Sequence, residues 1–184
     1  MKKALMIIIM VVIVIIISLT PGCLIQESIA IDKTKEAITK FDEEYWKISE
    51  EWVQLEKEFR KNTEDVKSDP NAAQEVKTIL EKQQKGYSEY ILKFKSINIP
   101  EPLDEFYYKK IEQFNSIMMM YNDFLRWADL LSLGDSGSKE LEELSKEANS
   151  YRDNGNELQL EAQKIQREVY REYGLDDLIT KWQK

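Results

Sequence analysis

The sequence predicts an all-α protein: an antiparallel up-down-up-down bundle of four long, coiled-coil-like helices, preceded by a hydrophobic signal or anchor helix. Apolar residues recur at alternating spacings of three and four in four long segments, which is the periodicity of one helix face. Glycine and proline interrupt residues 24–184 at only six places, namely Pro70, Gly86, Pro100 with Pro102, Gly134 with Gly137, Gly155 and Gly174. At the amino terminus, by contrast, residues 4–17 contain no polar residue at all.

The amino terminus has the layout of a secretory signal. Lys2 and Lys3 precede an apolar run at residues 4–19 that is broken only by Ser18. Sixteen residues at ~1.5 Å each give about 24 Å of helix, which is shorter than the ~30 Å hydrocarbon core of a bilayer. The only cysteine, Cys23, follows this run directly after Pro21 and Gly22.

With Gly22 and Cys23 at its end, this segment resembles a prokaryotic lipoprotein precursor. The resemblance covers residues 1–23 and implies cleavage before Cys23 and attachment of lipid, including palmitate, to the new first residue. The alternative is an uncleaved single-pass anchor that extends to Ile25. In both cases the lysines before the apolar run place the rest of the chain on the extracytoplasmic side of the cell membrane. We therefore divide the chain into a signal or anchor (1–22), a short tether (23–28) and a helical bundle (29–184).

The first predicted helix spans about residues 29–66 and the second about residues 70–97. Between them, Asp69 is a suitable N-cap and Pro70 a suitable first-turn residue. We call the row of residues at this alternating three-four spacing on one helix face a seam. The seam of the first helix consists of Ile31, Thr34, Ile38, Phe41, Tyr45, Ile48, Trp52, Leu55, Phe59, Asn62 and Val66. The seam of the second consists of Ala73, Val76, Leu80, Gln83, Tyr87, Tyr90, Phe94 and Ile97.

Pro100 and Pro102 end the second helix and open a third, because the residue before a proline avoids the helical conformation. Gly134 is a predicted C-terminal cap of the third helix, and Ser138 is a predicted N-cap of the fourth. Gly155 interrupts the fourth seam and predicts either a kink or a close approach of two backbones. After Gly174, a short amphipathic segment that contains Leu175, Leu178, Ile179 and Trp182 is predicted to fold over one end of the bundle.

Connections of four or five residues make consecutive helices antiparallel neighbours, which favours a monomeric bundle. Continuous seams are equally compatible with two long coiled-coil hairpins that complete their core in a homodimer.

The composition excludes several classes of function. Removing Lys2 and Lys3 leaves 24 basic against 34 acidic residues, and a net charge of −10 argues against a nucleic-acid partner. The chain has no histidine, which removes histidine-based catalysis, haem ligation and the Glu-x-x-His pairs of di-iron bundles. Met118, Met119 and Met120 point about 100° apart on a helix, so they do not converge on one copper ion. We predict no catalytic residues, no metal site and no cofactor.

Two groups of aromatic residues are candidates for binding. Tyrosines on the seams suggest a polar-lined pocket for a small ligand, although the same residues also suit a packed aromatic core. Tryptophans off the seams suggest a contact surface for a protein partner or for lipid headgroups, although they also suit the flanks of a wide core. The pocket candidates are Tyr87, Tyr90, Tyr121 and Tyr151, and the surface candidates are Trp46, Trp127 and Trp182.

The sequence therefore favours a non-enzymatic, membrane-tethered module with a binding or structural role. A ligand-binding or sensor bundle with a tyrosine-lined interior is the alternative.

Overall fold

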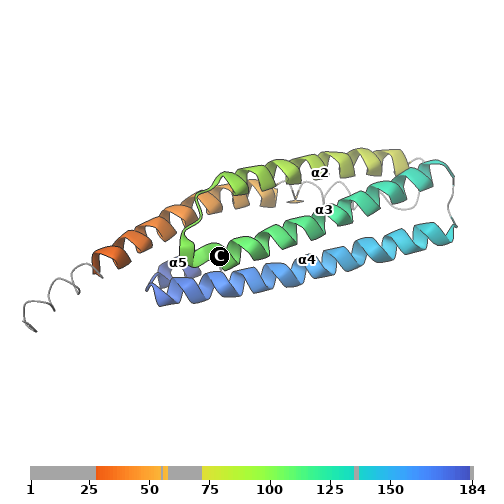
Figure 1. Ribbon diagram of the computed structural model, residues 1–184. Helices are drawn as coiled ribbons and strands as arrows, with labels where there is room; N and C mark the ends of the chain where they lie inside the picture. The colour runs from red at the N-terminus through yellow and green to blue at the C-terminus, as the bar shows by residue number, and fades with distance from the viewer. Residues whose placement is uncertain (1–27, 55, 58–71, 135–136, 183–184) are drawn as a thin grey trace, which may run out of the picture.

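The computed structural model describes residues 28–54, 56–57, 72–134 and 137–182, and these form long packed helices without any strand (Figure 1). The predicted all-α class is therefore confirmed. The predicted signal or anchor at residues 1–22, Cys23 and the predicted cap at Asp69 and Pro70 lie outside the described residues. None of the described helices is both long enough and apolar enough to cross a membrane.

The helices follow the predicted order along the chain. The N-terminal helix is described at residues 28–54 and 56–57, and its predicted continuation to residue 66 lies outside the described part. The other elements are α2 (Ala72–Ser96), the short 3-10 helix η1 (Glu101–Leu103), α3 (Asp104–Ser132), α4 (Lys139–Glu172) and α5 (Asp176–Lys181). The predicted amphipathic segment after Gly174 thus forms a helix of its own.

Local chemistry accounts for the helix ends. The Ser138 hydroxyl accepts a hydrogen bond from the Leu141 amide at 3.3 Å, which confirms the predicted N-cap of α4. Gly134 has φ +82°, and its amide donates to the Leu131 carbonyl at 3.0 Å, as expected of a residue that caps a helix in the left-handed conformation. Pro102 lies in the short 3-10 helix η1, which leads directly into α3.

Contacts between helices show that consecutive helices run antiparallel. Lys77 in α2 pairs with Asp129 late in α3 at 2.6 Å, whereas Ser88, later in α2, contacts Met118, earlier in α3. The contacts between α3 and α4 repeat this relationship, and the two helices lie side by side over most of their length (Figure 1). Here Lys109 pairs with Glu161 at 3.0 Å and Arg126 pairs with Glu140 at 3.1 Å.

Gly155 lies at a close contact between α4 and α3. A Cβ atom at this position would come within 2.6 Å of Ile117 Cδ1 and 3.1 Å of Ile117 Cγ1. Helix α4 runs without interruption through Gly155. The close approach predicted from the sequence is therefore present, although it is made between the Gly155 backbone and the Ile117 side chain rather than between two backbones.

Aromatic rings occupy much of the core between the N-terminal helix, α2 and α3. Phe94 is fully buried and meets the Tyr45 and Phe114 rings edge-on, with centroids 5.6 and 5.1 Å apart. Phe106 meets both Phe41 and Tyr45 edge-on. Such edge-to-face pairs stabilise the core beyond the burial of their surface.

Candidate functional site

Three charged side chains are buried among the described residues, Asp42, Lys110 and Asp123, and the first two are the least exposed. Asp42 in the N-terminal helix is 0% exposed, and Lys110 in α3 is 3% exposed. A buried charge is expensive unless other groups compensate for it, so the surroundings of each residue indicate what it does. We call their immediate partners the Asp42 cluster (Asp42, Gln166, Tyr170, Lys181 and Trp182) and the Lys110 cluster (Tyr45, Lys110, Gln113, Phe114 and Gln159).

The Asp42 cluster satisfies both oxygens of its carboxylate. The Tyr170 hydroxyl and the Trp182 indole nitrogen each donate to Asp42 Oδ1 at 2.7 Å. Lys181 Nζ donates to Asp42 Oδ2 at 3.0 Å and forms an ion pair with it. Gln166 in turn donates to the Tyr170 hydroxyl at 2.8 Å, so the network reaches a second turn of α4.

This arrangement fastens α5 to the N-terminal helix. Helix α5 has only six residues and no side-chain cap at its N-terminus, so it is too short to be stable without tertiary contacts. Its last residue, Lys181, and the following residue, Trp182, contact Asp42, and Lys181 Nζ lies 4.8 Å from the centre of the Trp46 ring. Burial and the negative charge of Asp42 raise the pKa of Tyr170, so its hydroxyl remains a donor.

The Lys110 cluster contains only neutral partners. Lys110 Nζ donates to Gln113 Oε1 at 2.5 Å and to Gln159 Oε1, on α4, at 2.6 Å. The same ammonium lies 4.9 Å from the centre of the Phe114 ring and 5.9 Å from that of Tyr45. Aromatic faces and amide oxygens stabilise a cation less well than a carboxylate does.

Burial lowers the pKa of Lys110 from 10.5 to about 7. The adjacent Lys109 behaves in the opposite way, because hydrogen bonding to Glu161 and the nearby charge of Glu112 raise the pKa of Lys109. Two consecutive lysines of α3 therefore have opposite environments: one faces a core without a counter-ion and the other faces carboxylates at the surface. A lysine with a pKa of about 7 is close to half protonated at pH 7, so it can change its charge within the physiological range.

Tyr45 joins the two clusters. One contact of its ring is with Trp182, with centroids 5.1 Å apart, and another is with the Lys110 ammonium. Tyr45 is buried, and burial raises the pKa of its hydroxyl well above the usual value. This ring thus separates the buried carboxylate and its ion pair from the buried lysine.

Three of the four predicted pocket tyrosines lie together. Tyr87, Tyr90 and Tyr121 are all buried, and the Tyr87 ring lies 5.9 Å from each of the other two. Trp52 packs on the same group, with its ring 4.5 Å from that of Tyr87. The Tyr121 hydroxyl donates to Gln83 Oε1 at 3.2 Å, a partner that the seam pattern suggested. These contacts make the group part of the aromatic core.

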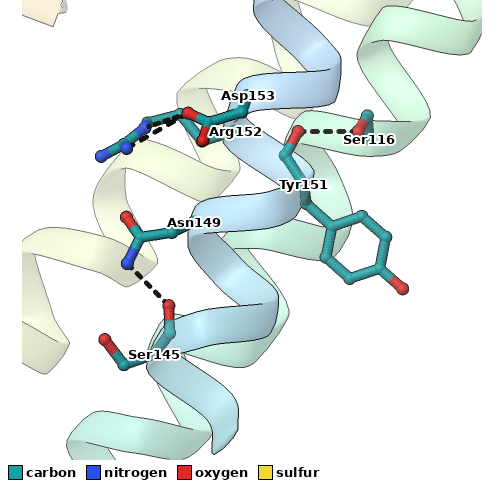
Figure 2. Close-up of polar contacts among 6 residues, drawn as sticks. All are labelled: Ser116, Ser145, Asn149, Tyr151, Arg152 and Asp153. Atoms are coloured by element: carbon teal, nitrogen blue, oxygen red, sulfur yellow. Dashed lines mark hydrogen bonds and ion pairs between the residues drawn. The ribbon is translucent and has the colours of Figure 1, made fainter. Parts of the chain in front are cut away.

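Tyr151 does not join these three tyrosines in the core. It is half-buried, and its ring points away from the other five side chains drawn in Figure 2. The contribution of Tyr151 to helix packing comes from its backbone, because its carbonyl accepts a hydrogen bond from the Ser116 hydroxyl at 2.8 Å. Asn154 also donates to Ser116, so these polar contacts between α3 and α4 lie next to the close approach at Gly155.

The three predicted surface tryptophans separate into two locations. Trp46 and Trp182 contact each other edge-on, with centroids 4.6 Å apart, as part of the contact between α5 and the N-terminal helix. Trp127 lies in the second half of α3, where it is half-buried and packs against the core.

Sequence reasoning missed Asp42 and Lys110, although the pattern contains a signal for each. Lys110 lies four residues after Phe106 and four before Phe114, so it occupies the apolar face of its helix. Asp42 lies four residues after Ile38 and three before Tyr45, on a buried face as well. A charged residue at such a position is a candidate for a buried polar site.

No three His, Cys, Asp or Glu residues are grouped so as to hold a metal ion in the part of the chain that the structure describes. Comparisons with protein-family models, with curated proteins and with solved structures found no match to this chain.

Proposed function

We propose that this chain is a membrane-tethered extracytoplasmic lipoprotein whose helical bundle serves as a non-enzymatic binding or structural module. The observation that carries the proposal is the position of Cys23. It is the only cysteine, it follows the apolar run immediately after Gly22, and it precedes the first described helical residue, Ser28, by five positions.

The length of this tether would keep the bundle close to the bilayer. Five residues span at most about 18 Å even when fully extended. The end of the bundle that carries the start of the N-terminal helix and α5 would then face the membrane (Figure 1). Two or more acyl chains on Cys23 would provide a stable anchor, whereas one chain gives only marginal binding.

The composition of the bundle supports a module that is exposed to solvent. Its described ion pairs, apart from the one at Asp42, lie between exposed or half-buried side chains, as at Lys77 and Asp129 or Lys109 and Glu161. The net charge of −10 beyond residue 22 opposes non-specific association with an acidic membrane surface. The aromatic core makes the described helices one packed unit that a tether could present to a partner.

The experiment that tests the anchor compares the wild-type chain with Cys23→Ser in a bacterial host. We expect the wild-type chain to incorporate an alkyne analogue of palmitate, to migrate faster than its precursor and to resist extraction from membranes by alkaline carbonate. Cys23→Ser should lose the label and remain at the precursor size. The matched control is the double variant Cys23→Ser/Ser28→Cys, which keeps one thiol five residues away and should also remain unlabelled.

Equal mobility and equal membrane retention of the wild-type chain and Cys23→Ser would overturn the lipid anchor and would favour an uncleaved single-pass anchor. Release of both proteins by carbonate would overturn membrane attachment altogether.

A further inference from the structure

The chain lacks the side chain that proteins ordinarily use to respond to pH near neutrality. It contains no histidine among its 184 residues. Lys110 nevertheless lies in the core, 3% exposed, at the junction of three helices. Its partners come from the N-terminal helix (Tyr45), from α3 itself (Gln113 and Phe114) and from α4 (Gln159).

We propose that Lys110 is a pH-sensitive switch of the bundle: the core accommodates its neutral amine, and protonation in mildly acidic surroundings loosens the packing of the N-terminal helix and α4 against α3. The Lys110 cluster offers an ammonium two amide oxygens and two aromatic faces but no carboxylate, so nothing in it compensates fully for the loss of water around a buried cation. The two glutamine oxygens accept hydrogen bonds from either form, but neither carries the negative charge that would offset a buried cation.

Carboxylates on the helices that surround Lys110 have other partners. On the N-terminal helix, Asp42 accepts from Tyr170, Lys181 and Trp182, so α5 and α4 supply its partners. On α4, Glu161 pairs with Lys109, which also pairs with Glu112 on α3. Lys110 therefore has no carboxylate partner among the described residues.

The remaining titratable groups that face the Lys110 cluster are tyrosines. Burial raises the pKa of Tyr45 on the N-terminal helix and of Tyr90, an α2 residue whose ring packs against Phe114. Both hydroxyls are therefore neutral in the range where Lys110 changes its charge. Two other α2 rings pack against Phe114: that of Tyr87, whose pKa is also raised by burial, and that of Phe94, which does not titrate.

The direction of the effect follows from the two states. Burial lowers the pKa of Lys110 in the folded state to about 7, whereas an unfolded lysine keeps a pKa near 10.5. Between these values the unfolded chain binds one proton more than the folded chain, so stability falls as the pH decreases from 10.5 towards 7. Below about pH 6 both states are protonated and this contribution becomes constant. The folded protein then carries the charge that its core accommodates poorly.

The test measures urea unfolding of the full-length chain in non-ionic detergent micelles from pH 5 to 9. For the wild type we expect the unfolding equilibrium constant to be about 50-fold larger at pH 7 than at pH 9, as two-state proton linkage predicts for these two pKa values. Lys110→Met, which keeps the aliphatic stem, should abolish this dependence. Lys109→Met, which alters the neighbouring exposed lysine, should retain it.

A second measurement uses only the wild-type protein, so it does not depend on whether a variant folds. The chemical shift of the Lys110 side-chain Cε in 13C-lysine-labelled wild-type protein should titrate near neutral pH. Amide exchange, corrected for its intrinsic pH dependence, should be faster at pH 6 than at pH 8 around Lys110 in α3 and Gln159 in α4.

A Lys110 resonance that titrates near pH 10, or an equal pH dependence of stability in the wild type and Lys110→Met, would overturn the proposal. Titration near neutral pH without any change in amide exchange would overturn the loosening of the helices. None of these outcomes depends on whether Cys23 carries lipid.

Discussion

The indole nitrogen of Trp182 donates a 2.7 Å hydrogen bond to the carboxylate of Asp42, a residue 140 positions earlier in the chain. This bond, together with the Lys181 ion pair to the same carboxylate, joins the last described helix to the first. Asp42 is fully buried, so water cannot replace the donors if the contact is lost. Helix α5, the shortest α-helix of the described residues, therefore depends on a single carboxylate for its hydrogen bonds to the N-terminal helix.

We predict that Asp42→Ala destabilises the protein by about 2–4 kcal/mol, because it leaves the buried Tyr170 hydroxyl and the Trp182 indole without their acceptor. Urea unfolding provides the measurement. The tryptophan emission should also shift to longer wavelength in the absence of urea, because α5 would detach and expose Trp182. The matched control is Glu43→Ala, which removes an adjacent but exposed carboxylate. Similar losses of stability in the two variants would show that the Asp42 cluster does not hold α5.

We predict that Gly155→Leu destabilises the protein by about 2–3 kcal/mol, because the added side chain overlaps Ile117 across the interface between α3 and α4. Gly155→Ala should be close to neutral, since its Cβ meets the flexible end of Ile117 and alanine favours the helix by about 1 kcal/mol over glycine. Ile117→Ala should partly rescue Gly155→Leu. Thermal unfolding measures all three.

The control for Gly155 is Gly137→Ala, because a Cβ at residue 137 meets no atom within 4 Å. An unchanged melting temperature for Gly155→Leu would contradict the close approach that the structure shows.

We predict a cooperative loss of structure above about pH 10. Burial raises the pKa values of the core tyrosines in the folded state, whereas an unfolded tyrosine ionises near pH 10. Their stabilising contribution is therefore fully present below pH 10 and is lost as the pH rises further. The residues concerned are Tyr45, Tyr87, Tyr90, Tyr121 and Tyr170.

Absorbance at 295 nm, which reports tyrosinate, should rise over the same pH interval in which helical circular dichroism is lost. If these five tyrosines ionise while the helical signal stays intact, the core admits their charged form and the prediction is wrong. Because the effect of Lys110 has the opposite sign below pH 10, maximum stability is expected near pH 9–10.

Local sequence information was sufficient for the helices and for several of their ends. Ser138 caps α4 through the amide three residues ahead, and Gly134 ends α3 through a carbonyl three residues behind. Both contacts are made within a few residues, so they follow from the chemistry of the turn itself. The seams placed Phe94, Phe114 and Tyr121 in the core for a similar reason, because helical periodicity selects the face to be buried.

The role of the tyrosines was only partly predictable. The seams brought Tyr87, Tyr90 and Tyr121 together, but the same pattern also included Tyr151, whose ring points elsewhere. Periodicity assigns a residue to a face, while the direction of the side chain depends on how closely the neighbouring helix approaches. At Tyr151 that neighbour is α3, whose Ser116 hydroxyl contacts the Tyr151 carbonyl rather than its ring.

The sequence by itself determined that this protein is helical, where several of its described helices begin and end, and that a basic and apolar segment with a single cysteine precedes them. Only the tertiary structure decided how the buried charges are compensated. The partners of Asp42 lie 128 to 140 residues away and one glutamine partner of Lys110 lies 49 residues away. Periodicity within one helix contains no information about which polar group a distant helix brings to the same place. The burial of Asp42 and Lys110, and the pKa shift that burial causes in Lys110, therefore arise only when the helices pack.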